Sequence, residues 1–187
     1  MRTPFNTYDF DGTIYDGDST VDFYLFSLKK SPKLLLTLLP NFVNVIRFKL
    51  KLITRSEFKE QFYKLFLPKI DTNKFVEQFW QAYEHKIKQW YLTQKQPSDL
   101  IISASADFLL EPICQKLSVH LLASKVDPKT GKLLSPNLRG IEKVKLFQKH
   151  YSNQTIDNFY TDQISDKPMM ELAKHCFLVD KNKILRL

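Results

Sequence analysis

The chain of 187 residues is 43% hydrophobic and 13% aromatic, and it carries a formal net charge of +8. This composition excludes collagen-like and disordered proteins, and it suffices for one packed domain or for a core with an inserted subdomain. The richest apolar run, residues 34–39, is far shorter than the roughly 20 apolar residues of a membrane-spanning helix. No signal peptide is visible either, so we expect a soluble, cytoplasmic protein.

The first predicted element is a short aromatic strand at residues 5–10, and a turn-rich segment follows at 11–18. From about residue 20 to residue 94 the chain has no glycine, and its apolar residues recur with helical spacing. Pro32 and Pro68 interrupt this stretch and predict breaks between successive helices. The aromatic residues along these helices are most simply explained as a helix–helix core.

Beyond residue 97, predicted strands and helices alternate. Strands are predicted at 99–103, 119–123, 159–161 and 176–179, and helices at 106–117, 141–150 and 168–174. Ser105 is the expected N-cap of the first of these helices, and residues 127–131 are expected to form a hairpin turn. This order predicts an α/β protein with a mainly parallel sheet, into which the helical stretch is inserted.

The positive charge is concentrated in residues 19–90, which contain 13 Lys and Arg against 6 Asp and Glu. A basic surface attracts phosphates, anionic lipids or nucleic acids, although plain solubilisation explains it equally well. The sequence has no zinc-finger spacing, no aromatic RNA-binding motif and no basic repeat. We therefore expect no nucleic-acid partner.

Two carboxylates separated by one residue, Asp9 and Asp11, lie where the first predicted strand ends, ahead of Gly12. Alternate residues of a strand point the same way, so the two acids can converge on one spot. Converging carboxylates repel each other unless a proton or a cation lies between them. Magnesium prefers oxygen ligands and often recruits phosphate, so the pair indicates a Mg²⁺ site for a phosphorylated ligand.

Three further groups lie near the carboxyl ends of predicted strands or at the start of a helix, where open α/β sheets bind their ligands. They are Ser103, Lys143 and the acidic pair Asp162 and Asp166. With Asp9 they provide a nucleophile, a hydroxyl donor, a cation and carboxylates for a metal. Phosphoryl transfer requires this combination of groups.

These four elements, in this order, resemble the four motifs of the haloacid dehalogenase superfamily. The sequence D-x-D-G-T at residues 9–13 is similar to the phosphatase branch of that superfamily. A helical insertion between the first two motifs is typical of its phosphoserine-phosphatase-like subgroup. The resemblance implies a Rossmann-like core, formed by residues 1–18 and 92–187, and an all-helical cap at residues 19–91.

The resemblance also implies catalytic roles. Asp9 would attack phosphorus and form an aspartyl phosphate, and Asp11 would act first as a general acid and then as a general base. Ser103 would donate a hydrogen bond to a phosphoryl oxygen, and Lys143 would offset the charge of the phosphate. Lys145 remains an alternative to Lys143, as a cation on the same predicted helix.

The metal that the resemblance implies is Mg²⁺. Its expected ligands are Asp9, the backbone carbonyl of Asp11, and Asp162, with Asp166 supporting the set. Asp162 and Asp166 have an alternative role, because either could cap the helix that follows them.

Substrate contacts are expected from the turn after the first strand and from the second motif. The candidates are Gly12, Thr13, Asp18 and Ser105, of which Ser105 is also the alternative hydroxyl donor to Ser103. No basic residue that would bind a carboxylate of the substrate is identified from the sequence.

We therefore predict a Mg²⁺-dependent phosphomonoester hydrolase that acts on a small phosphorylated metabolite. One alternative substrate is a lipid-linked phosphomonoester such as phosphatidylglycerophosphate. The basic, apolar stretch at residues 29–55 would then dock on an anionic membrane surface. A phosphotransferase is a second alternative, and a non-catalytic binding protein on the same fold is the least favoured.

Overall fold

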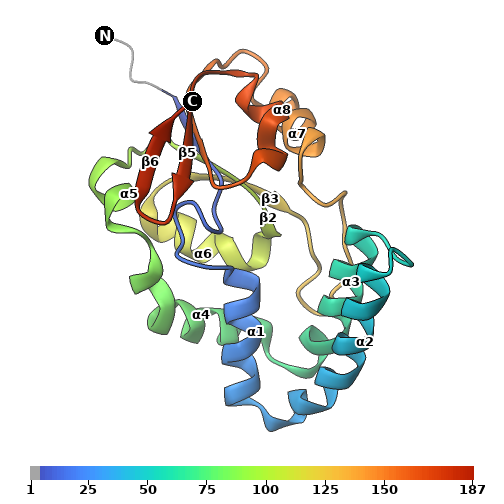
Figure 1. Ribbon diagram of the computed structural model, residues 1–187. Coiled ribbons are helices and arrows are strands. Elements are labelled where there is room, and N and C mark those ends of the chain that lie inside the picture. The colour runs from blue at the N-terminus through green and yellow to red at the C-terminus, as the bar shows by residue number, and fades with distance from the viewer. Residues whose placement is uncertain (1–4) are drawn as a thin grey trace.

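The computed structural model describes residues 5–187, so residues 1–4 of the predicted core segment lie outside it. Its centre is a six-stranded sheet with the strand order β3-β2-β1-β4-β5-β6 (Figure 1). The strands are β1 (Asn6–Tyr8), β2 (Leu100–Ala106), β3 (His120–Ser124), β4 (Ile156–Thr161), β5 (Ala173–Asp180) and β6 (Lys183–Arg186). All neighbouring pairs are parallel except β5 and β6, which confirms the predicted mainly parallel α/β sheet.

Eight α-helices lie within the described chain. They are α1 (Ser19–Lys30), α2 (Leu38–Lys49), α3 (Arg55–Phe66), α4 (Thr72–Tyr83), α5 (Gln89–Gln94), α6 (Asp107–Leu117), α7 (Ile141–Tyr151) and α8 (Lys167–Met170). Successive residues of β2 enter different hydrophobic clusters, Ile101 with α4 and α6 and Leu100 with α7 and α8. The sheet is therefore covered on both faces, as parallel sheets are.

Helices α1 to α5 all lie between β1 and β2 in the chain, as the sequence predicts. Figure 1 shows α1 to α4 gathered at one end of the molecule, away from β5, β6, α7 and α8. The predicted breaks at Pro32 and Pro68 are confirmed, because each proline lies in a short 3₁₀ turn between two α-helices, η1 (Pro32–Thr37) or η2 (Leu67–Lys69). Among residues 5–187, no helix is both long and apolar enough to cross a lipid bilayer.

Capping side chains fix where the inserted helices begin. Asp18 accepts a hydrogen bond from the Val21 N–H at the start of α1. Thr54 and Glu57 form a reciprocal capping box at the start of α3. Such caps satisfy backbone donors that the first helical turn leaves unpaired. They therefore define the orientation of the helix ends that reach the site described below.

The inserted helices and the sheet share one hydrophobic cluster, which includes Tyr8 of β1, Phe23 of α1 and Phe79 of α4. The predicted turn at residues 127–131 is confirmed, and it lies against the inserted helices. Its Pro128 carbonyl accepts a hydrogen bond from Thr72 Oγ1 at 2.7 Å. These contacts hold the helical segment and the sheet together as one packed body.

Three local predictions are wrong. The helix predicted at 168–174 ends at Met170, because Ala173 already pairs with Ile156 in the sheet. Strand β6 was not predicted, since its two apolar residues, Ile184 and Leu185, are adjacent and do not alternate with polar ones; all four of its residues are exposed. Ser105 is not the N-cap of α6, a position that Ala106 occupies without a side-chain hydrogen bond.

Candidate active site

Asp9 lies directly after β1 and is almost fully buried. Its Oδ1 atom accepts hydrogen bonds from the Phe10 N–H at 2.8 Å and from Lys143 Nζ at 3.0 Å. Among the described residues, no hydrogen bond is made to its Oδ2 atom. Burial raises the pKa of Asp9 to about 7, against the opposing effect of Lys143. The Oδ1 atom is thus held in place by two hydrogen bonds, while the Oδ2 atom is free to contact a bound ligand.

Lys143, near the start of α7, lies between two acids. Its Nζ atom contacts Asp9 at 3.0 Å and Asp166 at 2.7 Å, and the residue is only 2% exposed. Burial alone would lower the pKa of Lys143, but the two carboxylates raise it above its ordinary value. The side chain of Lys145 is 64% exposed and pairs with Glu142 instead. The structure therefore brings Lys143, and not Lys145, to Asp9.

Asp166 contacts Lys143 and accepts a second hydrogen bond from Thr161 Oγ1 at 3.1 Å. It makes no side-chain cap to α8, so the capping alternative does not hold for this residue. Its carboxylate position is set by the cation and by the end of β4. Asp166 therefore acts on Asp9 indirectly, by holding the Lys143 side chain that contacts Asp9.

Asp11 is positioned by α1 and by the segment after β2. Its Oδ1 atom accepts a hydrogen bond from the Ser19 N–H at 2.6 Å, and its Oδ2 atom accepts one from the Ser105 hydroxyl. Burial raises the pKa of Asp11 to about 6, and nearby Asp18 adds to the effect. The carboxyl is therefore poised to gain or lose a proton close to neutral pH.

Ser103 and Ser105 have different surroundings. Ser103 is 1% exposed and lines the central cavity, and its Oγ atom accepts a hydrogen bond from the Ser105 N–H at 3.1 Å. The Ser105 hydroxyl contacts Asp11 and Thr20 and is not part of the cavity wall. Of the two serines, Ser103 has the position expected for a phosphate donor.

Asp162 follows β4 and is held by the turn after β1. Its backbone N–H donates to Thr13 Oγ1 at 2.9 Å, and the same hydroxyl lies 3.3 Å from its Oδ1 atom. Gly12 has a φ of +72°, and a Cβ built there would lie 2.2 Å from Asp162 Oδ2. Only glycine permits this close approach. Gly12 and Thr13 thus position Asp162 and do not line the cavity.

Asp9 and Asp162 are the two carboxylates at the ends of β1 and β4 that could contribute oxygen ligands to a magnesium ion. Burial raises the pKa of both carboxyls, the charge of Asp166 raises each further, and the charge of Lys143 opposes the shift. Within residues 5–187, no three His, Cys, Asp or Glu side chains converge closely enough to bind a metal by themselves. Magnesium commonly uses one or two carboxylates and completes its shell with water and phosphate oxygens, so this donor set is sufficient.

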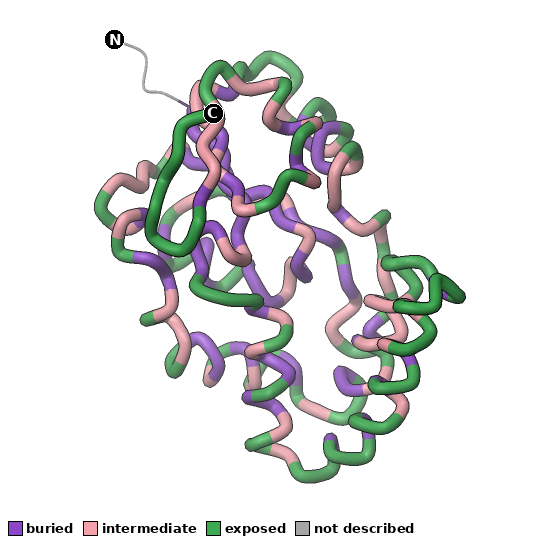
Figure 2. The backbone as a smooth tube through the Cα atoms, viewed as in Figure 1, coloured by how far each residue is buried: buried purple, intermediate pink, exposed green. Residues whose placement is uncertain are grey.

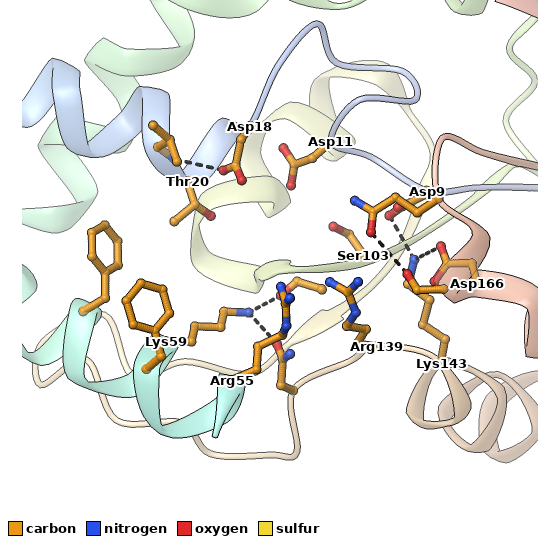
Figure 3. Close-up of a pocket in the computed structure, with 17 residues that line it drawn as sticks. Asp9, Asp11, Asp18, Thr20, Arg55, Lys59, Ser103, Arg139, Lys143 and Asp166 are labelled. Carbon is orange, nitrogen blue, oxygen red and sulfur yellow. Dashed lines mark hydrogen bonds and ion pairs between the residues drawn. The ribbon is translucent and has the colours of Figure 1, made fainter. Parts of the chain in front are cut away.

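A cavity of about 290 Å³ lies between the inserted helices and the end of the sheet (Figure 3). Six predicted site residues line it: Asp9, Asp11, Asp18, Ser103, Lys143 and Asp166. The other four, Gly12, Thr13, Ser105 and Asp162, do not line it, and Gly12 and Asp162 line a separate pocket instead. Most of the predicted groups are thus brought together around one space.

Three basic residues of the cavity were missed from the sequence: Arg55, Lys59 and Arg139. Arg55 and Lys59 lie on the first turns of α3, and Arg139 precedes α7. Figure 3 shows the two guanidinium groups directed toward the cavity. Burial lowers the pKa of Arg55, and the proximity of Arg139 lowers it further. Two like charges at close range favour an anion between them.

Lys59 connects α3 to the core. Its Nζ atom donates to the Ala104 carbonyl and to Asn137 Oδ1, the latter at 2.9 Å. Burial lowers the pKa of Lys59 to about 8. Arg55 and Lys59 are four residues apart, which is about one helical turn. This spacing could have predicted that the two cations share one face of a helix. Arg139 gave no such signal.

The sequence matches the model of the haloacid dehalogenase-like hydrolase family over residues 7–171. The chain belongs to this family, and the protein is therefore a hydrolase of the haloacid dehalogenase type. No curated protein matches the sequence closely enough to identify a relative.

Solved structures with the same fold include a protein of unknown function from Bordetella pertussis Tohama I. It is 16% identical, with a TM-score of 0.78 over 94% of this chain and 89% of its own. A phosphoserine phosphohydrolase-like protein from Francisella tularensis is 15% identical, with a TM-score of 0.62 over 96% and 90% of the two chains. A probable phosphoserine phosphatase from Vibrio cholerae is 12% identical, with a TM-score of 0.68 over 92% and 56%. At these identities the likeness concerns the fold.

Proposed function

We propose that the protein is a Mg²⁺-dependent phosphomonoester hydrolase that forms an aspartyl phosphate at Asp9. The observation that carries the proposal is the state of Asp9: one oxygen is held by Lys143, and the other is unpaired at a cavity that also contains Asp11. A fixed carboxylate beside a proton donor is the arrangement that in-line attack on phosphorus requires.

In the first step, Asp9 Oδ2 attacks phosphorus and the bond from phosphorus to the ester oxygen breaks. Asp11 gives its proton to the leaving alkoxide, a role supported by its pKa of about 6. Lys143 and Ser103 would offset the charge on the phosphoryl oxygens. When bound by Asp9, Asp162 and the Asp11 carbonyl, Mg²⁺ would neutralise further negative charge at this point.

In the second step, Asp11 takes a proton from water while the water oxygen attacks phosphorus. The bond between phosphorus and Asp9 breaks, which releases inorganic phosphate and restores the Asp9 carboxylate. Asp11 ends protonated and ready for the next substrate. Closure of the inserted helices over the cavity would limit the access of bulk water in the first step.

A small phosphorylated metabolite with a second negative charge is the substrate class that the cavity supports best. Its volume of about 290 Å³ suits a small molecule, and Arg55 and Arg139 offer a second anion site beside the phosphate site. Several structures with this fold bear phosphoserine phosphatase names. An amphiphilic phosphomonoester is the second candidate, because part of the inserted segment exposes an apolar face.

The proposal is tested by the release of phosphate from p-nitrophenyl phosphate, with Mg²⁺ or with EDTA, for the wild type and Asp9→Asn. We expect turnover that depends on Mg²⁺ and falls at least about 1,000-fold in the variant. Asp16→Asn is the control, because Asp16 is an exposed acid of the same loop. Turnover that survives in Asp9→Asn would overturn the assignment of the nucleophile.

A further inference from the structure

The outer side of η1 and α2 is apolar. Seven large side chains on it are between 41% and 80% exposed: Leu35, Leu36, Leu38, Leu39, Phe42, Val43 and Ile46. We call these seven residues the outer face. Figure 2 shows exposed residues along this segment, interrupted by isolated buried ones. Contiguous exposed apolar side chains of this kind mark a surface that binds an apolar partner.

The inner side of the same segment is partly polar. The buried positions are Leu34, Thr37, Asn41 and Asn44, which recur with helical spacing. Tyr24 of α1 joins this side, since its hydroxyl lies 2.6 Å from Thr37 Oγ1 and accepts from Asn41 Nδ2 at 3.2 Å.

An ordinary surface helix buries its apolar stripe and exposes its polar one. Here asparagines face the protein, while leucines and a phenylalanine face outward. Packing within this chain therefore does not account for the apolar residues of α2. Their exposure is best explained by a partner that covers them.

Basic residues predominate among the charges around the outer face, and the acid nearest to them is Glu57 of α3, beside Arg47. Between Asp22 and Glu57 the chain has no acidic residue but seven basic ones, Lys29, Lys30, Lys33, Arg47, Lys49, Lys51 and Arg55. Three of them precede the outer face and the rest follow it, so cations flank the apolar residues at both ends. Lys and Arg beside apolar side chains are typical of helices that lie in the interface of an anionic membrane.

We propose that the outer face docks on the surface of an anionic lipid bilayer. The apolar side chains would enter the headgroup boundary, while the flanking cations other than Arg55, which faces the cavity, contact lipid phosphates. A second copy of this chain is a poorer partner, because pairing two outer faces would bring like charges together. Helix α2, with 12 residues, is too short to span a bilayer, so the segment would lie on the membrane.

The outer face also leads to the cavity. The exposed Leu50 and Leu52 follow α2, and three residues later Arg55 opens α3 and lines the cavity. A docked molecule would therefore hold its cavity close to the lipid headgroups. Docking would place the second candidate substrate, an amphiphilic phosphomonoester, within reach of the cavity. This consequence rests on the proposed function, whereas the docking itself does not.

The test is co-sedimentation with vesicles of phosphatidylcholine containing phosphatidylglycerol, and with vesicles of phosphatidylcholine alone. We expect the wild type to bind the anionic vesicles only, and to bind them less at high salt because the cations are screened. Leu36→Ser with Leu39→Ser should weaken binding at least about tenfold. Leu134→Ser with Leu187→Ser is the matched control, because both leucines are exposed elsewhere.

Absence of wild-type binding to anionic vesicles would overturn the proposal, and so would equal binding by both double variants. Self-association that the Leu36→Ser, Leu39→Ser variant abolishes, without vesicle binding, would overturn it in favour of a second copy. The far-UV circular dichroism spectrum of each variant verifies that it is folded. Sedimentation requires no turnover, so docking and the proposed function can fail separately.

Discussion

At the scale of single residues, the site depends on the buried charges of Asp9, Lys143 and Asp166, which pair with one another. Lys143 is the only cation in contact with both Asp9 and Asp166 among the described residues. Breaking a buried ion pair from one side leaves uncompensated charge behind. The roles of these residues can therefore be tested through stability as well as through activity.

We expect Lys143→Met to lower the free energy of unfolding by about 3 kcal/mol at neutral pH, since two buried acids would lose their cation. Phosphatase activity should fall at least about 100-fold. Lys145→Met, at an exposed position on the same helix, should change stability by less than about 0.5 kcal/mol. Chemical denaturation of the two variants measures the difference, and equal stabilities would contradict the described arrangement.

At neutral pH we expect the protein with Asp11 to have a lower free energy of unfolding than the variant Asp11→Asn. Burial raises the pKa of Asp11 from 3.8 to about 6, so its charged form is disfavoured in the folded state. The contribution of the protonated Asp11 carboxyl to the free energy of unfolding is fully present below pH 4 and is lost as the pH rises through 6. In EDTA, Asp11→Asn should therefore be roughly 2 kcal/mol more stable at pH 8, with a gain that disappears at pH 4. Asp16→Asn should show no such gain in thermal unfolding.

At the scale of elements, the site forms where strands end. The turn after β1 and the loop after β4 approach each other at Gly12 and Asp162. Parallel strands bring their carboxyl ends to one edge of the sheet, which is why residues 150 positions apart in the chain become neighbours. The closeness of this approach requires a glycine.

Gly12→Ala should therefore weaken the binding of Mg²⁺ by about tenfold or more, because the new Cβ would displace Asp162. Gly140→Ala is the matched control: it also has a positive φ, of +56°, but its Cβ would lie 3.6 Å from the nearest atom. That variant should lose about 1 kcal/mol of stability and keep its affinity for Mg²⁺. The affinity is measured by titrating Mg²⁺ into the phosphatase assay. Equal affinities in the two variants would exclude the role assigned to Gly12.

At the scale of the whole molecule, the inserted helices are tied to the sheet across the cavity. Lys59 makes this connection by its bonds to Ala104 and Asn137. Lys59→Met should raise KM about tenfold with a small effect on kcat, because α3 would lose a contact that holds it over the cavity. Lys64→Met, on the outer side of the same helix, should leave KM unchanged. Steady-state kinetics with p-nitrophenyl phosphate decides between these results.

The sequence was sufficient for the order of the main helices and of strands β1 to β5, but not for β6 or for the end of β2. Asp9 and Lys143 could be located because local patterns identify strand ends and helix starts. The strand predicted to end at Ser103 continues to Ala106, so Ser103 lies within β2. Arg139 could not be located, since its place at the cavity depends on the path of an irregular loop. The inward direction of Asn41 was equally hidden, because helical spacing shows which residues share a face but not which face is covered.

The central claim is a covalent phosphoryl intermediate on Asp9, and trapping it is the most direct test. The protein is mixed with p-nitrophenyl phosphate and Mg²⁺, quenched during turnover, and reduced with borohydride, which converts an aspartyl phosphate to homoserine. We predict homoserine at position 9 by peptide mass spectrometry, and none without substrate. Homoserine at another aspartate, or turnover with none at all, would contradict the account.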